Sequence, residues 1–404
     1  MRARRLSRPH AFWSVTAMLG VVLGGSAVVS PLYRVYQVEW HFSEITLTAV
    51  FAVYAVTVMA VLLVAGSLSD QVGRRPMVAL ALIAEAVAAV LFLTAGGVAS
   101  LYAGRVLQGV ATGAGASAAG AAILDLQPGD RPTLGSTVNA CGSSIALAVG
   151  AMAAGLVVQY APAPTRLVFW LLLAASLAGV AVLAVVDDPV ARKAVQLAHF
   201  RPRAGVPAGA RRAFVTALPA LVATWALGGF FFSLAPSLTE QLAGSTDTVW
   251  GGTAVFLLSA PAGLASFRGR QMLPGSAMAG GSAVLAFGSA GALAAIVAGS
   301  AAALLVATAV AGVGFGLGFL GAFRHLSGLA PDDERGALVA TIYVVSYLAF
   351  SVPVVVAGAA VSHFGLHDVA VTYAAVVTVL GLSSALGGAR GRRPGQAAAG
   401  RPSG

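Results

Sequence analysis

Long apolar runs separated by short polar segments dominate this sequence. A helix needs about twenty residues to cross a hydrocarbon layer of about 30 Å, and each run is close to that length. The first six runs lie at residues 12–32, 45–68, 77–93, 99–124, 134–158 and 167–186. After a polar stretch, six more lie at 214–234, 249–264, 273–297, 301–320, 337–361 and 369–386. The pattern predicts an all-α polytopic membrane protein whose transmembrane helices form two six-helix bundles.

The runs divide the chain into five segments and indicate its orientation. We expect an N-terminal tail at 1–11, a first bundle at 12–186, a linker at 187–212, a second bundle at 213–386 and a disordered tail at 387–404. Of the 24 Lys and Arg residues, 21 lie on the side of the termini, Arg34 and Arg166 lie on the other side, and Arg105 lies within a run. The positive-inside rule therefore predicts that both termini are cytoplasmic and that the chain is a multi-pass protein of the cell's inner or plasma membrane.

The two halves echo each other. Leu23-Gly24-Gly25 recurs as Leu227-Gly228-Gly229, and Arg131 with Leu134 recurs as Arg335 with Leu338, all 204 positions apart. A constant offset indicates a duplicated unit. Because each copy holds six runs, both copies have the same orientation, which predicts two pseudo-symmetric bundles.

Composition narrows the class of protein. Hydrophobic residues make up 58% of the chain and charged residues 9%, which excludes a water-soluble surface. A net charge of +10 comes from arginines between the runs, so we expect contact with lipid and not with nucleic acid. The single cysteine and the scattered histidines predict no metal site, and no nucleotide-binding loop, catalytic cluster or cofactor motif is found. We expect a protein that is not an enzyme and that is monomeric.

A compact charged turn joins the second and third runs. The stretch from Gly66 to Pro76 contains Asp70, Gly73, Arg74 and Arg75. A glycine at 66 lets backbones approach closely, and a glycine at 73 permits a turn that other residues resist. Asp70 can face a helix N-terminus while the arginines stay at headgroup level.

This turn resembles the signature loop between helices two and three of the major facilitator superfamily of transporters. A second stretch, Leu101 to Gly109 with Arg105 and Gln108, resembles the superfamily's signature on helix four. The resemblance is to the twelve-helix branch of drug/proton antiporters. It implies a solute site between the halves, transport by alternating access, and gating by Asp125 together with the turn residues Gly66, Asp70, Gly73, Arg74 and Arg75.

The resemblance also implies that Arg105 takes part in proton coupling. Independently, a fixed cation near a cavity can hold a neighbouring carboxyl ionised or release it. The alternative is a structural arginine bonded to carbonyls on the first helix. Glu85 is the other ionisable group within a run, and it either pairs with Arg105 or is protonated and hydrogen-bonded to a neighbour.

Helix five carries the exporter signature in related transporters, but only its outer glycines, Gly150 and Gly155, are kept here. Candidates for the solute cavity are polar or aromatic residues on helices expected to line it: Ser26, Tyr54, Gln108, Asn139, Trp225, Phe232, Tyr343, Ser346 and Tyr347. The sequence favours proton-coupled efflux of a small, largely neutral or lipophilic solute. A nutrient importer or facilitator of the same fold and a membrane sensor without flux stay open.

Overall fold

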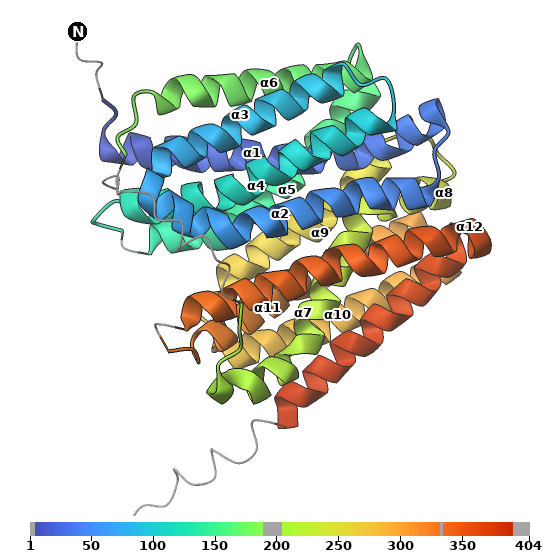
Figure 1. Cartoon of the computed structure of the whole chain (residues 1–404). Helices are drawn as coiled ribbons and strands as arrows, with labels where there is room; N and C mark the ends of the chain where they lie inside the picture. The colour runs from blue at the N-terminus through green and yellow to red at the C-terminus, as the bar shows by residue number, and fades with distance from the viewer. Residues whose placement is uncertain (1–4, 132, 189–203, 332–333, 391–404) are drawn as a thin grey trace, which may run out of the picture.

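The computed structural model describes residues 5–131, 133–188, 204–331 and 334–390. The first half contains α1 (Arg8–Trp40), α2 (Glu44–Val72), α3 (Arg74–Leu93), α4 (Val98–Leu126), α5 (Leu134–Tyr160) and α6 (Pro164–Leu183). The second half contains η2 (Ala208–Ala210), α7 (Arg211–Ser233), α8 (Ala235–Ala243), α9 (Val249–Gly269), α10 (Pro274–Val297), α11 (Ala301–Ser327) and α12 (Arg335–Arg390). Over these residues the protein is entirely helical, as the sequence predicts (Figure 1).

The last helix accounts for two membrane crossings. Eleven helices in the described part of the chain are long and apolar enough to cross a membrane. One of them, α12, has 56 residues and would be about 84 Å long if straight, far more than a bilayer core. Gly365, with a φ of 80°, interrupts the helix. Figure 1 shows the two arms of α12 meeting at the end of the bundle opposite the chain termini. With α12 crossing twice, the described helices make the predicted twelve passes.

Local chemistry explains several helix starts. Ser43 accepts a hydrogen bond from the Thr46 amide at the start of α2, and Ser300 accepts one from the Ala303 amide at the start of α11. These side chains satisfy amides that have no partner inside the helix. Gly73, with a φ of 107°, permits the abrupt passage from α2 to α3.

The two halves use the same packing scheme. In the first half α3 packs on α4 and α6, and in the second half α10 packs on α11 and on α12. In both copies a glycine of the repeated pair lies close to a backbone carbonyl of the fifth helix of its half. An added carbon at Gly24 of α1 would come within 3.1 Å of the Ala146 carbonyl of α5, and one at Gly229 of α7 would collide with the Phe350 carbonyl of α12. Small residues thus allow close helix contacts at corresponding places.

Two pairs of helices join the halves. α5 packs against α9, and α2 packs against α12. At the end of the bundle opposite the termini, the Thr248 hydroxyl donates to the Gly155 carbonyl at 3.2 Å, and Gly358 of α12 lies directly against Thr48 of α2.

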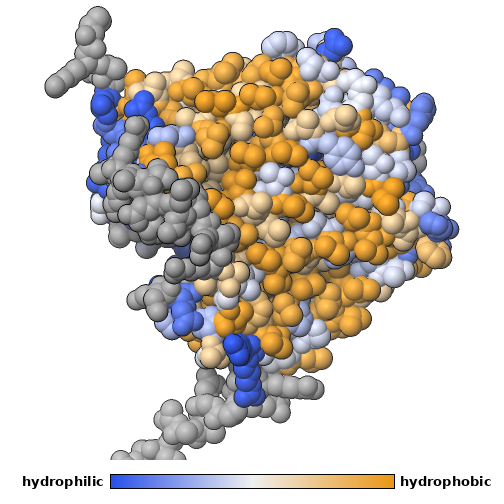
Figure 2. Space-filling view, viewed as in Figure 1, coloured by the Kyte–Doolittle hydropathy of each residue, from blue (hydrophilic) through white to orange (hydrophobic). Residues whose placement is uncertain are grey.

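Large apolar side chains cover the flanks of the bundle. Phe287 is 75% exposed and Val306 68% exposed, and Figure 2 shows an apolar band with hydrophilic residues gathered at the two ends. Such a band matches the hydrocarbon core of a bilayer.

Three predicted boundaries differ from the structure. α1 begins at Arg8, inside the predicted tail, because Pro9 suits the first helical turn. The predicted seventh run ends at 234, but α8 continues to Ala243. The predicted linker includes η2 and the start of α7, while its residues 189–203 and tail residues 391–404 lie outside the described part.

Candidate functional site

Arg105 lies at the centre of a polar network inside the first bundle. Its side chain is 1% exposed. Its Nε donates to the Tyr33 hydroxyl at 2.7 Å, and its Nη1 donates to the Ser26 carbonyl at 2.8 Å and to Gln108 Oε1 at 2.9 Å. The guanidinium carbon also lies 4.6 Å from the centre of the Tyr54 ring. A buried cation needs such partners, since an isolated one would be strongly unfavourable.

Glu85 joins this network through an amide and not by direct contact with the arginine. Gln108 Nε2 donates to Glu85 Oε1 at 3.1 Å and to the Gly25 carbonyl at 3.0 Å. Glu85 is 0% exposed, and its Oε2 has no hydrogen-bond partner. A carboxyl group with one free oxygen, connected to a cation by one amide, is an arrangement that can accept and release a proton.

Gly25 makes this contact between α1 and α3 sterically feasible. A side-chain carbon at Gly25 would overlap Glu85 Oε1 and come within 2.8 Å of Leu172 Cδ1. The sequence repeat identifies this glycine, but not the buried acid that it faces.

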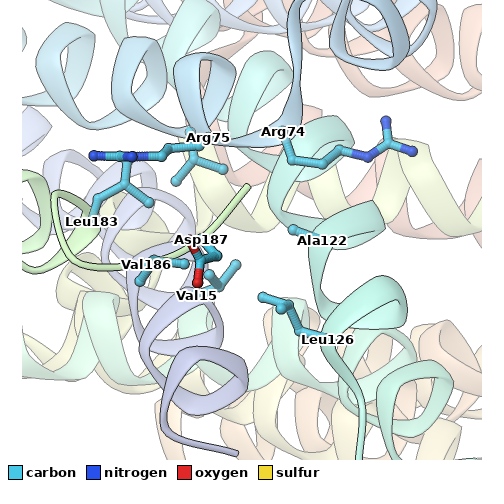
Figure 3. Close-up of a pocket in the computed structure, with 9 residues that line it drawn as sticks. Val15, Arg74, Arg75, Ala122, Leu126, Leu183, Val186 and Asp187 are labelled. Carbon is cyan, nitrogen blue, oxygen red and sulfur yellow. The ribbon is translucent and has the colours of Figure 1, made fainter. Parts of the chain in front are cut away.

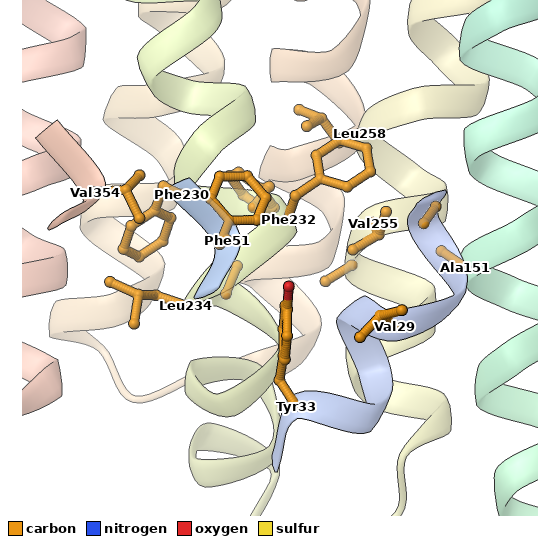
Figure 4. Close-up of a cluster of buried hydrophobic side chains, with 14 of the residues drawn as sticks. Val29, Tyr33, Phe51, Ala151, Phe230, Phe232, Leu234, Val255, Leu258 and Val354 are labelled. Atoms are coloured by element: carbon orange, nitrogen blue, oxygen red, sulfur yellow. The ribbon is translucent and has the colours of Figure 1, made fainter. Parts of the chain in front are cut away.

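A second cluster, the interface aromatic cluster, lies where the halves meet. We define it as Phe51 and Tyr54 of α2, Trp225 of α7, and Tyr347 and Phe350 of α12. The Trp225 ring lies 4.9 Å from that of Tyr347 and 5.7 Å from that of Phe350, which in turn lies 4.8 Å from Phe51. Tyr54 packs with Tyr347 and Phe350 in one apolar cluster. Figure 4 shows Phe51 with Phe230 and Phe232 of α7, which belong to the same buried apolar cluster.

The predicted cavity residues fall into three groups. Ser26, Tyr54 and Gln108 belong to the Arg105 network, where the backbone carbonyl of Ser26 is the contact. Trp225 and Tyr347 belong to the interface aromatic cluster. The others lie apart: Phe232 ring-to-ring at 6.3 Å from Phe350, Tyr343 at 6.0 Å from Phe323, Asn139 donating to the Gly120 carbonyl at 2.8 Å, and Ser346 buried without a hydrogen-bond partner.

Three of these side chains have buried polar atoms without a partner. Trp225 Nε1, Ser346 Oγ and Asn139 Oδ1 are buried and have no hydrogen-bond partner. Buried polar atoms in proteins are nearly always paired, so these are candidates for contact with a solute.

At the end of the bundle that carries the termini, Arg74 brings two of the predicted gating acids together. It pairs with Asp70 at 2.5 Å and with Asp125 at 3.3 Å, and it donates to the Ser69 hydroxyl at 2.7 Å. Figure 3 shows Arg75 extending in the opposite direction, where it donates to the Ala184 carbonyl at 2.8 Å. The crevice beside them has a volume of about 10 Å³, which is room for one water at most.

Asp188 completes this end of the bundle, and sequence analysis missed it. Its carboxylate accepts hydrogen bonds from the backbone amides of Arg74 at 3.1 Å and Arg75 at 3.4 Å. It thus caps the N-terminus of α3, where a negative charge is favourable. Gly73 is required because any side chain there would collide with this carboxylate. At Gly66, by contrast, an added carbon would meet only Ser117 Oγ at 3.7 Å, so the expected close approach is not observed.

Comparisons with known proteins agree with this geometry. The model of the Major Facilitator Superfamily matches residues 12–352. No curated protein matches the sequence. The human organic anion transporter MFSD10 (TETRAN) is similar in structure, with a TM-score of 0.63 and 16% identity over 94% of this chain and 100% of that one.

Two further solved structures share the fold. A POT family transporter in complex with 5-aminolevulinic acid has a TM-score of 0.73 and 10% identity over 92% of this chain and 94% of that one. A variant of the nucleoside transporter NupG has a TM-score of 0.72 and 11% identity over 94% of this chain and 100% of that one. The family match covers most of the sequence, and the chain therefore belongs to the Major Facilitator Superfamily, as a multi-pass membrane transporter and not an enzyme.

Proposed function

We propose that this secondary transporter moves a small, largely neutral or lipophilic solute by alternating access and couples its export to proton entry. The observation that carries the proposal is the interface aromatic cluster, to which both halves contribute, next to the buried network of Arg105, Gln108 and Glu85. A solute held between the halves contacts both of them, so its binding can be stronger in one arrangement of the halves than in the other.

The lining chemistry supports a neutral cargo. The side chains that meet between α2, α7 and α12 are aromatic, and the unsatisfied groups on α7 and α12 are the indole N–H of Trp225 and the hydroxyl of Ser346. Such a surface gives shape selection and one or two hydrogen bonds and offers no compensating charge. Trp225 and Tyr347 provide the apolar faces. The Nε1 of Trp225 would donate a hydrogen bond to a carbonyl or ether oxygen of the solute.

Proton coupling is assigned to Glu85, with Arg105 as the group that senses its charge. Tyr54 connects the two sites: its ring lies under the guanidinium of Arg105, and its body packs with Tyr347 and Phe350. A solute that displaces Tyr54 changes the surroundings of Arg105, and thereby the strength with which Glu85 holds a proton. In this scheme Arg74, Asp70 and Asp125 stabilise one arrangement of the cytoplasmic ends.

Flux measurements test the proposal. The purified protein is reconstituted in liposomes, a pH gradient is imposed in either direction, and uptake of a panel of lipophilic and polar neutral solutes is measured. Accumulation of solute inside the liposomes while protons flow out supports coupled export, because solute and protons then move in opposite directions. Uptake in the direction of proton flow would identify an importer, an alternative that the incomplete exporter signature between Gly150 and Gly155 leaves open. Equilibration without accumulation would identify a facilitator. No flux of any solute would identify a sensor.

A further inference from the structure

A separate cavity lies at the end of the bundle opposite the termini. It has a volume of about 360 Å³ and is bounded by both halves. Its charged lining consists of Arg34 of α1, Glu44 of α2 and Glu240 of α8, and Leu366 of α12 supplies an apolar wall. The remaining lining is polar and comes from α8 and the loop that follows it: Ser237, Gln241, Gly244, Ser245 and Thr246.

The two acids have oxygens that lack any donor. Glu240 is 5% exposed, and its Oε1 has no hydrogen-bond partner. Oε2 of Glu44 is likewise buried and unpartnered. Ionised carboxylate oxygens only accept, and neither of these two is paired with the donors that the lining contains, which include Arg34, Ser237 and Gln241.

The charges of the cavity favour one class of occupant. When both acids are ionised, the two carboxylates and one guanidinium leave one negative charge, which a monovalent cation neutralises. An alkali ion needs a much smaller cage, and Arg34 repels a divalent metal about twice as strongly as a monovalent cation. An organic ammonium group offers N–H donors, a single charge and an apolar body that fits beside Leu366.

We propose that this cavity is a binding site for a small organic ammonium ion, held between Glu240 and Glu44. The site contains neither the Arg105 network nor the interface aromatic cluster, and its ligand need not be the transported solute. Because its walls come from α1 and α2 on one side and α8 and α12 on the other, occupancy favours the arrangement in which these ends are together.

The affinity of the site for the ammonium ion should depend on pH. Burial raises the pKa of Glu240 to about 8, the charge of Arg34 opposes this rise, and that of Asp247, just before α9, adds to it. The cation needs the ionised carboxylate, so a proton competes with it. From pH 9 to pH 7 the apparent affinity should fall by about tenfold, since each pH unit below the pKa cuts the ionised fraction about tenfold.

The experiment uses the purified full-length protein in lipid nanodiscs at pH 9 and constant ionic strength. Benzylammonium chloride is the probe, benzyl alcohol is its neutral match and sodium chloride is the inorganic cation; binding is measured by calorimetry and thermal shift. We expect saturable binding of benzylammonium only. Affinity should fall at least about tenfold in Glu240→Gln and in Glu44→Gln, because each loses a desolvated charge.

Two further variants separate binding from damage to the fold. Arg34→Gln removes the repelling charge, but Arg34 also opposes the rise in the pKa of Glu240. This variant should therefore need a higher pH for half-maximal binding than the wild type, a shift that misfolding cannot imitate. Glu39 is an exposed acid on α1, the helix of Arg34, and it does not line the cavity. Glu39→Gln should therefore bind benzylammonium like the wild type. Three results would overturn the proposal. The first is an equal thermal shift with benzyl alcohol or sodium, and the second is unchanged affinity in Glu240→Gln. The third is no binding at pH 9, which would mean that Glu240 holds only a proton.

Discussion

Arg105 and Glu85 share one amide. Gln108 accepts from the arginine through Oε1 at 2.9 Å and donates to the acid through Nε2 at 3.1 Å. The two ionisable groups of the predicted coupling pair are thus linked in series through a side chain that is itself 0% exposed.

Arg105→Lys tests whether this network couples protons. Lysine keeps the charge but lacks the planar fork that reaches Tyr33, Ser26 and Gln108 together. Proton-driven transport should fall by about tenfold or more, since small misplacements of reacting groups are costly. Solute exchange without a gradient should fall much less. Both are measured in liposomes, with the exposed Arg131→Lys as control; equal loss of both activities would assign Arg105 a structural role.

Gly25→Ala tests the contact between α1 and α3. The new methyl group would overlap the Glu85 carboxylate and Leu172, so we expect a loss of about 1–3 kcal/mol in stability, as for other overpacked cores. Gly20→Ala on the same helix is the control, because nothing lies within 4 Å of the added carbon. Thermal unfolding in detergent compares the two. If the variants unfold at the same temperature, the close approach at Gly25 is not needed.

The number of crossings could be predicted because hydropathy over twenty residues depends on composition alone. The repeated glycines could be predicted to matter, since both copies kept them. That Gln108 lies between Arg105 and Glu85 could not be predicted, because it depends on which faces of α1, α3 and α4 meet.

Long-range contacts and short helices explain the other omissions. Asp188 caps a helix that begins 114 positions earlier, and no local pattern connects it with Arg74. Glu240 follows the predicted seventh run, which ends at 234, and lies on α8, which is too short and too polar to stand out as an apolar run. The internal repeat contained the missing signal: Glu240 is 204 positions after Tyr36, which lies within α1, so the helix should continue there.

Asp70→Asn tests the charged cluster of Asp70, Arg74 and Asp125 at the end of the bundle that carries the termini. The pair with Arg74 is largely exposed on the acid's side, at 63%, so its loss should cost less than about 1 kcal/mol. Transport should nevertheless fall sharply, because the pair is proposed to stabilise one of the two arrangements. Flux per reconstituted molecule and the amount of protein in the membrane are measured together, with the exposed Asp130→Asn as control. Normal flux in Asp70→Asn would remove this residue from the mechanism.

Trp225→Ala tests the solute site. The indole packs against Tyr347, Phe319 and Phe350, and its Nε1 has no partner, so its removal takes away both a flat apolar face and a donor. We expect KM to rise several-fold, since a buried aromatic contact is worth about 0.5–1.5 kcal/mol beyond its area. The rise should be largest for solutes with an acceptor oxygen. Trp170→Ala is the control, as that side chain is 57% exposed on the flank. A uniform loss of flux for all solutes would argue against a role in selection.

Glu240→Gln should change how stability depends on pH. Burial raises the pKa of Glu240 to about 8 in the folded protein, whereas an unfolded glutamate titrates near 4.5. Between these values the folded state retains a proton that the unfolded state has lost, so rising pH favours unfolding. The contribution is fully present below about pH 4.5 and is lost as the pH rises through 8. Without ammonium ligands, the Tm of the wild type should therefore fall relative to that of Glu240→Gln from pH 5 to pH 9, while Glu39→Gln follows the wild type. A difference in Tm that stays constant over this range would mean that Glu240 titrates normally in the folded protein.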